Sequence, residues 1–242
     1  MKVLFAGPSI YGCDLDLGGI VLRPPAKQGD VIAAVREGAT AIGLVDGYFG
    51  GAAAVWHKEI LYALSSGVRV LGASSMGALR AAECAAYGME PVGEVADAYV
   101  SGRLDDDAAV ALVHAPPEFG SQPMSEPLVD ANATIDALER LGVLTAVEVS
   151  ALRHSAENCF FGDRTAEAIA QRAGLAEDRA VEICQLYSLH HVSIKQRDAL
   201  LLIERLRSAP DERVLVQRSW NFAVTPLWRQ LFDTVNEAVT PV

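Results

Sequence analysis

The feature that most constrains the fold is a series of short, nearly continuous apolar runs separated by segments with helical spacing. The apolar runs are Val3–Gly7, Thr40–Asp46 and Val68–Ala73, and the helical segments are Asp30–Gly38, Val55–Ser66 and Met76–Tyr87. Strands that are apolar along their whole length are typical of a parallel sheet with helices on both faces. The first half therefore predicts an α/β fold with a mostly parallel sheet. Its strand ends converge on one edge, where we expect the loops Pro8–Gly12, Asp46–Gly51 and Ser74–Gly77.

The second half has a different pattern, which is helical almost throughout from Glu126 onward. Thr145-Ala-Val-Glu148 matches a capping box. The segment Ser193–Arg207 has one amphipathic face, with Ile194, Leu201, Leu202 and Leu206 as its apolar residues. Asp105–Asp107 predicts the start of a helix running to His114. A proline-rich break follows, so we expect an α/β core over residues 1–117 and an all-helical C-terminal domain over residues 118–242.

Composition excludes several classes of function. The chain has 242 residues, with 31 Asp and Glu against 20 Lys and Arg, and a net charge of −11. Binding to nucleic acid or to an anionic membrane needs a basic surface, so neither is expected. The chain contains neither a Walker motif nor G-x-G-x-x-G, which argues against nucleotide hydrolysis by this chain alone. We therefore expect no cofactor, and the sequence leaves a homo-oligomer open.

Targeting and cysteine patterns predict a cytoplasmic protein. The first apolar run stops at Gly7-Pro8, too soon for the core of a signal peptide, and no stretch approaches 18 uninterrupted apolar residues. The four cysteines are scattered and form no C-x-x-C pair. This spacing argues against a metal site and against a disulfide framework, so we expect reduced thiols.

The strongest local signal lies where a predicted strand turns directly into a predicted helix. Ala73-Ser-Ser-Met-Gly77 is the nucleophile-elbow pattern with alanine at its first glycine. Such a turn would place the Ser75 hydroxyl at the sheet edge, with the backbone amides of residues 74–77 free to hold an oxyanion. Two other interpretations stay open. Ser74 or Ser75 could cap the helix, or the helix N-terminus could bind a carboxylate or phosphate unaided.

His57 is the second candidate, because it opens a helix that follows a glycine-rich loop at the same edge. There it could act as general base for Ser75, with Asp46 or Glu59 orienting its ring. The alternative is a solvent-facing helix on which Lys58 and Glu59 are ordinary surface charges, and an Asp46-Gly47 pair that only makes a turn.

The helix after Ser75 carries Arg80 and Glu83, which are three residues apart. This spacing predicts an ion pair on the helix surface or a clamp to the neighbouring helix, although Arg80 could instead meet a carboxylate at the site. Cys84 lies in an alanine-rich run, which favours a buried structural thiol.

The motifs that carry a family resemblance cover roughly the first 115 residues. They are Gly7-Pro-Ser9, Pro24-Pro-Ala-Lys-Gln-Gly-Asp30, Asp46-Gly-Tyr-Phe49, Val55-Trp-His-Lys-Glu-Ile60, Gly72-Ala-Ser-Ser-Met-Gly-Ala-Leu-Arg-Ala-Ala-Glu83, and Gly102-Arg-Leu-Asp-Asp-Asp-Ala-Ala-Val-Ala-Leu112 with His114. In order and combination they resemble the TfuA family. The helical half is a looser match, with Lys195-Gln-Arg-Asp-Ala-Leu-Leu201 as its clearest piece.

The resemblance implies a role in making peptide backbone thioamides. TfuA proteins accompany YcaO-family enzymes, which use ATP to activate a peptide amide oxygen so that a sulfur nucleophile can replace it. A TfuA protein is thought to supply the sulfur, by recruiting a donor or by releasing sulfide from a thiocarboxylated ubiquitin-like carrier. The expected partners are therefore a YcaO-family enzyme and such a carrier.

Thiocarboxylate hydrolysis is acyl transfer, which suits a serine at an elbow beside an oxyanion hole. The catalytic candidates are Ser75, His57 and Asp46. The candidates for substrate binding are Ser9, Lys58, Ser74, Met76, Gly77, Arg80 and Glu83, in which Lys58 or Arg80 would meet the carrier's tail. Two alternatives stay open. The protein could be a non-catalytic partner that recruits the donor and activates the YcaO enzyme, or a stand-alone esterase-like hydrolase.

Overall fold

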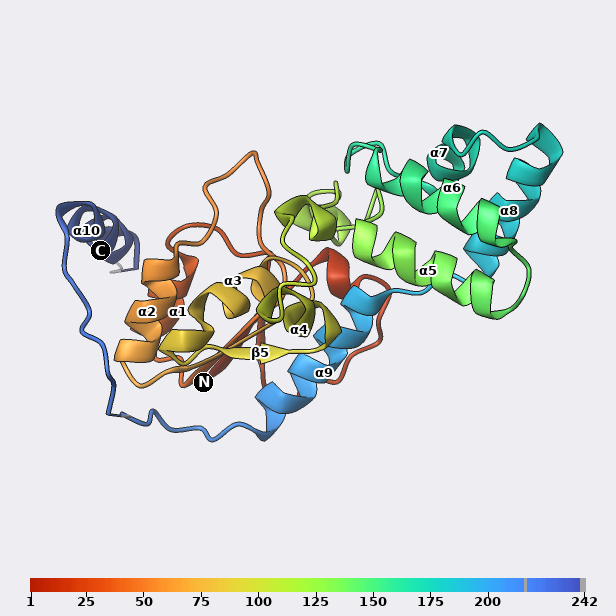
Figure 1. Cartoon of the computed structure of the whole chain (residues 1–242). Helices are drawn as coiled ribbons and strands as arrows, with labels where there is room; N and C mark the ends of the chain where they lie inside the picture. Colours follow the sequence, from red (N-terminus) through yellow and green to blue (C-terminus); the bar gives the residue numbers. More distant parts are fainter. Residues whose placement is uncertain (216, 240–242) are drawn as a thin grey trace. The chain divides into compact units, whose positions relative to one another are not determined.

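The computed structural model describes residues 1–215 and 217–239, which form two compact units (Figure 1). An α/β unit contains residues 1–104 together with the described residues from Arg197 onward, and a helical unit contains Asp105–Gln196. The expected boundary lay between residues 117 and 118, whereas the structure places it at residues 104 and 105 and returns the chain to the α/β unit at Arg197. The difference arises because the last part of the chain returns to the α/β unit and packs there.

The sheet has five strands in the order β2-β1-β3-β4-β5, and every neighbouring pair is parallel. The strands are β1 (Lys2–Phe5), β2 (Val21–Arg23), β3 (Ala41–Leu44), β4 (Arg69–Ala73) and β5 (Glu90–Val92). The predicted α/β class and parallel sheet are confirmed. The sequence did not indicate β2 and β5, because each has only three residues and Val21 and Leu22 in β2 are exposed.

Helices cover both faces of the sheet. The helices α1 (Asp30–Arg36), α2 (His57–Ser65), α3 (Met76–Cys84) and α4 (Glu94–Val100) follow the strands, and α9 (Ile194–Ser208) comes from the far end of the chain. Val3, Ile42 and Val70 pack in one core cluster with residues of α1 and α2, whereas Leu4 and Leu71 pack in a second cluster with α9. This alternation gives a sheet with a helix layer on each side.

The helix α9 approaches the sheet closely. A Cβ atom added at Gly43 would lie 2.6 Å from Leu202 Cδ2, so glycine makes this approach possible. The buried face of α9 is formed by Ala199, Leu202, Ile203 and Leu206. Leu201, which was predicted for this face, is partly exposed instead. Asp198 of α9 also caps α4, because its carboxylate accepts hydrogen bonds from Glu94 N at 2.9 Å and Val95 N at 2.8 Å.

The last helix, α10 (Pro226–Val239), lies beside α1 and α2 (Figure 1). Tyr62 of α2 contacts Phe222, Trp228 and Phe232, with ring centroids 5.3 to 6.1 Å apart. Aromatic contacts of this kind bury large apolar areas and fasten the C-terminal segment to the α/β unit.

The helical unit is built from α5 (Leu128–Arg140), α6 (Ala146–Glu157), α7 (Ala166–Arg172) and α8 (Glu177–Leu189). Its core contains Ile135, Leu138, Leu152, Ile169 and Ile183. The predicted capping box is confirmed, since Glu148 N donates to Thr145 Oγ1 and Thr145 N donates to Glu148 Oε2. None of the helices in the described ranges has the length and apolar character that crossing a membrane requires.

The predicted helix from Asp105–Asp107 to His114 is wrong. Asp106 does cap a helix, but it is a short 3-10 helix, η3 (Asp107–Val110). The backbone beyond it is extended and pairs with a later segment, as Met124 N donates to Val113 O and Val113 N donates to Ser125 Oγ. These contacts compete with helical hydrogen bonds and end the helix early. Three other short 3-10 helices are η1 (Pro8–Ile10), η2 (Ala85–Tyr87) and η4 (Pro117–Phe119).

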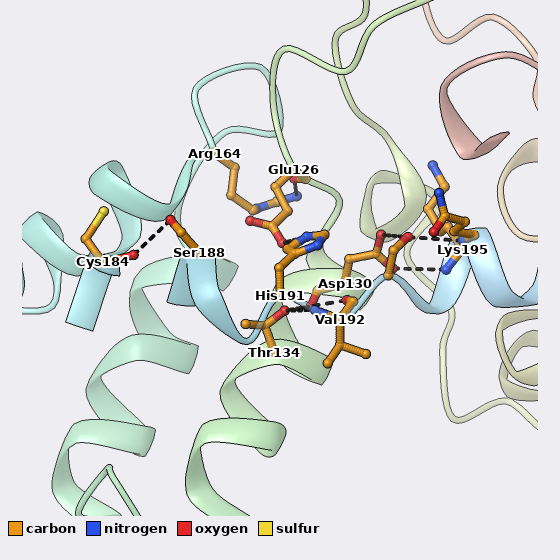
Figure 2. A network of polar contacts seen from close by, with 11 residues as sticks. Glu126, Asp130, Thr134, Arg164, Cys184, Ser188, His191, Val192 and Lys195 are labelled. Carbon is orange, nitrogen blue, oxygen red and sulfur yellow. Dashed lines mark hydrogen bonds and ion pairs between the residues drawn. The ribbon is translucent and has the colours of Figure 1, made fainter. Parts of the chain in front are cut away.

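A buried polar network fastens residues 191–195 to α5 (Figure 2). The Asp130 carboxylate accepts hydrogen bonds from Ser193 Oγ at 2.7 Å and Lys195 N at 3.1 Å. Thr134 Oγ1 accepts one from Val192 N at 2.9 Å, and Lys195 Nζ donates to Val110 O at 2.8 Å. Burial raises the pKa of Asp130, while Lys195 and the Ser193 hydroxyl act to lower it. These hydrogen bonds fix the backbone of residues 192–195 against α5.

Candidate functional site

The sheet order places a topological switch point at the carboxyl ends of β1 and β3. β1 and β3 are neighbours in the sheet. β2, which follows β1 in the chain, lies on one side of this pair, and β4, which follows β3, lies on the other. In parallel α/β sheets, ligands bind at such a switch point. The segments that leave β1, β3 and β4 here include Ser9, Asp46 and the Ser74–Gly77 turn. The predicted edge therefore coincides with the place where this topology favours binding.

Asp46 anchors the edge. Its side chain is buried, with 1% exposure, and accepts hydrogen bonds from Gly7 N at 2.8 Å, Ser9 N at 3.0 Å and Ser9 Oγ at 2.6 Å. Ser74 Oγ donates in turn to Ser9 Oγ at 2.9 Å. A continuous hydrogen-bonded chain therefore runs from Ser74 through Ser9 to the Asp46 carboxylate, and it joins the ends of three strands. Each member is buried.

The turn between β4 and α3 is strained. Ser74 has a φ of 69°, and Ser75 N donates to Ala73 O across it at 2.8 Å, which makes a tight turn of three residues. Non-glycine residues seldom adopt this conformation, and it costs on the order of 1 kcal/mol. The strain falls on Ser74, one residue before the predicted nucleophile.

Ser75 itself is the N-cap residue of α3, and its side chain makes no capping hydrogen bond. Ser75 therefore occupies the predicted cap position, but its side chain does not provide the capping hydrogen bond. The nine-residue helix α3 begins directly after it. The positive end of that helix dipole lies beside the Ser75 backbone and favours negative charge there.

Glycines let α3 lie directly against the strand ends. A Cβ atom at Gly77 would overlap Leu44 O, and Gly77 N donates to Val45 O at 3.1 Å. Met76 packs over Gly47, where a Cβ atom would lie 2.8 Å from Met76 Cγ. Among the amides predicted to hold an oxyanion, those of Ser75 and Gly77 already donate to backbone carbonyls.

A second cluster holds His57, Arg80 and Glu83. His57 Nε2 lies 2.7 Å from Glu83 Oε2, and the Arg80 guanidinium lies 2.6 Å from the same oxygen. Arg80 Nε also donates to Val55 O at 3.1 Å. The predicted Arg80–Glu83 pair and the clamp to the neighbouring helix are both confirmed.

The structure does not bring His57 to Ser75. Its ring is paired with Glu83, and Glu83 follows Ser75 by eight residues, or about 12 Å along the axis of α3. Neither Asp46 nor Glu59 makes a hydrogen bond to His57, although one of them was expected to orient it. The Asp46 carboxylate holds Gly7 and Ser9, as described above.

Glu59 and Lys58 have other roles. Glu59 is fully buried, and its carboxylate accepts hydrogen bonds from Gly29 N at 2.8 Å and Trp56 N at 3.0 Å. Burial raises the pKa of Glu59 to about 7 despite these hydrogen bonds, so Glu59 is not the surface charge that one interpretation expected. Lys58 Nζ donates to Thr225 Oγ1 at 3.1 Å. Lys58 is thereby tied to the segment that leads into α10.

Cys84 is buried, as predicted, and burial raises the pKa of its thiol to about 11. The hydroxyl chain from Ser74 to Asp46, by contrast, was missed. The sequence carries a signal for it, because Gly-Pro-Ser follows the first predicted strand and Asp46 follows the second. That signal becomes useful only when the strand order shows that the two strands are neighbours.

Comparison with protein-family models finds a match to the description "TfuA-like protein" over residues 46–165. The chain belongs to the TfuA-like family. The match begins at Asp46 and contains Ser74 and Ser75, and it extends through α6 of the helical unit. A search of curated proteins found no match. The TfuA-like family is associated with YcaO partners.

Proposed function

We propose that this TfuA-like chain delivers sulfur for YcaO-dependent peptide backbone thioamidation by hydrolysing a thiocarboxylated ubiquitin-like carrier. The observation that carries the proposal is the strained Ser74–Ser75 turn at the amino end of α3, held by the buried Ser9–Asp46 pair. The family association supports the partner class. The position at the switch point supports binding of a slender carrier tail at this edge.

In the proposed reaction, Ser75 Oγ attacks the carbon of the carrier's terminal thiocarboxylate. The carbon–sulfur bond breaks, an ester forms on Ser75, and sulfur leaves as hydrosulfide with the hydroxyl proton. Water then hydrolyses the ester, which returns the carrier as a carboxylate and restores the hydroxyl. The amino end of α3 stabilises the oxyanion formed in each step. Asp46 and Ser9 act as positioning residues, since they hold the turn that carries Ser75.

A second candidate function is a docking partner that recruits the donor and activates the YcaO enzyme without turnover of its own. The pairing of His57 with Glu83 favours it, because the predicted general base is held away from Ser75. In this case the amino end of α3 binds the anionic carrier terminus and breaks no bond. A general-base role for His57 would require its ring, which is 50% exposed, to leave Glu83.

The two functions differ in how a YcaO enzyme responds to free sulfide. We would assay peptide thioamidation with ATP and the YcaO enzyme, and supply sulfur either as the thiocarboxylated carrier or as free sulfide. The proposal predicts that Ser75→Ala abolishes the carrier-dependent reaction and leaves the sulfide-dependent one intact. The docking function predicts a modest loss with the carrier, which sulfide does not restore.

Ser66→Ala is the matched control, since Ser66 belongs to the same unit and its hydroxyl donates to Tyr62 O within its own helix turn. Carrier-dependent thioamidation at the full rate without this chain would overturn the partnership. If Ser75→Ala supports that reaction at the wild-type rate, the nucleophile is wrongly assigned.

A further inference from the structure

The negative charge of the chain is concentrated in the helical unit. Residues 105–196 contain 15 Asp and Glu against 6 Lys and Arg, a net charge of −9 out of −11 for the whole chain. The remaining residues are close to balanced. The helical unit therefore produces an acidic surface that the α/β unit does not share, and such a surface attracts basic partners.

An open groove of about 550 Å³ lies between α7 and α8 of this unit. Its apolar lining is formed by Ala170, Leu175, Ala180, Val181 and Cys184, and its polar lining by Glu167, Gln171, Glu177 and Gln185. These described residues include two carboxylates and no Lys or Arg. The volume is in the range of sites that enclose several side chains of a ligand.

The two carboxylates of the groove lack a basic partner. Elsewhere in the unit, acidic side chains are neutralised in place, as Glu148 and Glu182 each lie 2.7 Å from Arg179. Within the described part of the chain, neither Glu167 nor Glu177 forms an ion pair. Hydrogen bonds from its own backbone amide and from the Thr165 hydroxyl lower the pKa of Glu167. The described lining of the groove therefore holds two carboxylates and no Lys or Arg that would neutralise them.

We propose that this groove docks a basic amphipathic helix of a partner protein. Apolar side chains of that helix would lie on Ala170, Val181 and Cys184, while its Lys or Arg side chains would meet Glu167 and Glu177. This is the helix-in-groove mode of recognition, and the charged edges would make its affinity fall with salt. The proposal goes beyond sulfur delivery and does not depend on the role of Ser75.

The probe is a fluorescein-labelled amphipathic peptide of about 14 residues, with leucine at helical spacing and lysine elsewhere. Its counterpart carries glutamate in place of lysine. Fluorescence anisotropy with the full chain measures binding of each peptide. We expect binding of the lysine peptide, weaker binding as salt rises from roughly 50 to 300 mM, and no binding of the glutamate peptide.

Matched variants separate docking in the groove from general attraction to an acidic unit. Val181 is 55% exposed in the groove and Val147 is 77% exposed on α6, so glutamine is tolerated at either position. We expect Val181→Gln to weaken binding about tenfold and Val147→Gln to change it less than about twofold. Glu167→Gln should weaken binding and reduce its salt dependence, whereas Glu157→Gln on α6 should change neither.

Three results would overturn the proposal. They are no binding of the lysine peptide, equal binding of both peptides, and an equal loss of affinity in the groove and control variants. Sedimentation of the chain alone gives a further test, because a dimer that Val181→Gln dissociates would assign the groove to a second copy. Thermal unfolding confirms that each variant is folded before its binding is compared.

Discussion

The α/β unit and the helical unit both bury polar side chains, but the buried groups contact different partners. In the helical unit, Arg164 donates to Ala156 O, Cys159 O and Glu126 O, and Ser155 donates to Ile169 O. These side chains satisfy backbone carbonyls and so stabilise the fold. In the α/β unit, Ser74, Ser9 and Asp46 bond to one another at a sheet edge. Asp46 also accepts hydrogen bonds from the backbone amides of Gly7 and Ser9, and this cluster lies at the edge where the topology favours a ligand.

The two units also differ in charge. The helical unit carries most of the net negative charge, whereas the α/β unit is nearly balanced. Our two proposals assign different tasks to the units: the α/β unit would hold the chemical groups, and the helical unit would provide a surface for recognition. Substitutions at the sheet edge of the α/β unit should therefore change sulfide release, and substitutions in the groove of the helical unit should change peptide binding.

The largest effect on stability is expected from Gly77→Ala. The new methyl group would overlap Leu44 O, and a backbone atom at the end of the central strand β3 cannot move aside as a side chain can. We expect a loss of about 3 kcal/mol or more in the free energy of unfolding, measured by urea denaturation. Gly142→Ala in the helical unit is the control, because nothing lies within 4 Å and only its φ of 70° opposes alanine. Its cost should be about 1 kcal/mol, and equal losses would contradict the close packing of α3.

Arg164→Ala tests whether the buried polar groups of the helical unit are structural. The substitution removes a buried side-chain donor from three carbonyl oxygens, so we expect a loss of about 2 to 3 kcal/mol in unfolding free energy. Arg140→Ala should cost less than about 0.5 kcal/mol, because that side chain bonds Asp136 O at the surface. If both variants unfold at the same urea concentration, Arg164 does not hold the loop.

Ser9→Ala should have a smaller effect on stability and a clear one on function. It removes the Ser9 hydroxyl from Asp46 and from Ser74, while the bond from Ser9 N to Asp46 remains. We expect a cost of about 1 kcal/mol and a lower rate of sulfide release, because the strained turn loses its support. Ser65→Ala is the control, since its hydroxyl donates to Tyr62 O within its own helix. Unchanged sulfide release with Ser9→Ala would show that the hydroxyl chain does not position Ser75.

How much of this could be predicted depended on the range of the interaction. The strand ends and the turn at Ser74–Ser75 are local features, and their apolar runs and glycines indicated them correctly. The partner of His57 depends on how α2 is rotated against α3, which periodicity does not specify. The sequence therefore predicted a contact between His57 and Ser75, whereas the structure pairs His57 with Glu83. The bond between Ser9 and Asp46 required the strand order. The return of α9 to the sheet depends on contacts with Leu4 and Gly43, far away in sequence.

The smallest effect is expected at the His191–Glu126 pair, whose atoms Nε2 and Oε1 lie 3.0 Å apart (Figure 2). The hydrogen bond to Glu126 raises the pKa of His191 above 6.5, against the effect of burial. A raised pKa in the folded state means that the pair stabilises the protein fully below pH 6.5. This contribution is lost as the pH rises through the higher folded value.

His191→Gln should therefore lower the free energy of unfolding by about 0.5 kcal/mol near pH 5.5 and by almost nothing near pH 9. Urea denaturation at the two pH values measures this difference. The exposed His154, which contacts Asn158, provides the control variant His154→Gln. A loss for His191→Gln that is the same at both pH values would contradict the assigned ion pair.

The central claim is that Ser75 at the amino end of α3 releases sulfide from a thiocarboxylated carrier. The most direct test is the initial rate of sulfide release from purified carrier by wild type, Ser75→Ala and the control Ser66→Ala, without any YcaO enzyme. We predict that Ser75→Ala loses about a thousandfold or more of the wild-type rate while it stays folded and still binds the carrier. Ser66→Ala should keep the full rate. Sulfide release by folded Ser75→Ala at the wild-type rate would contradict the account.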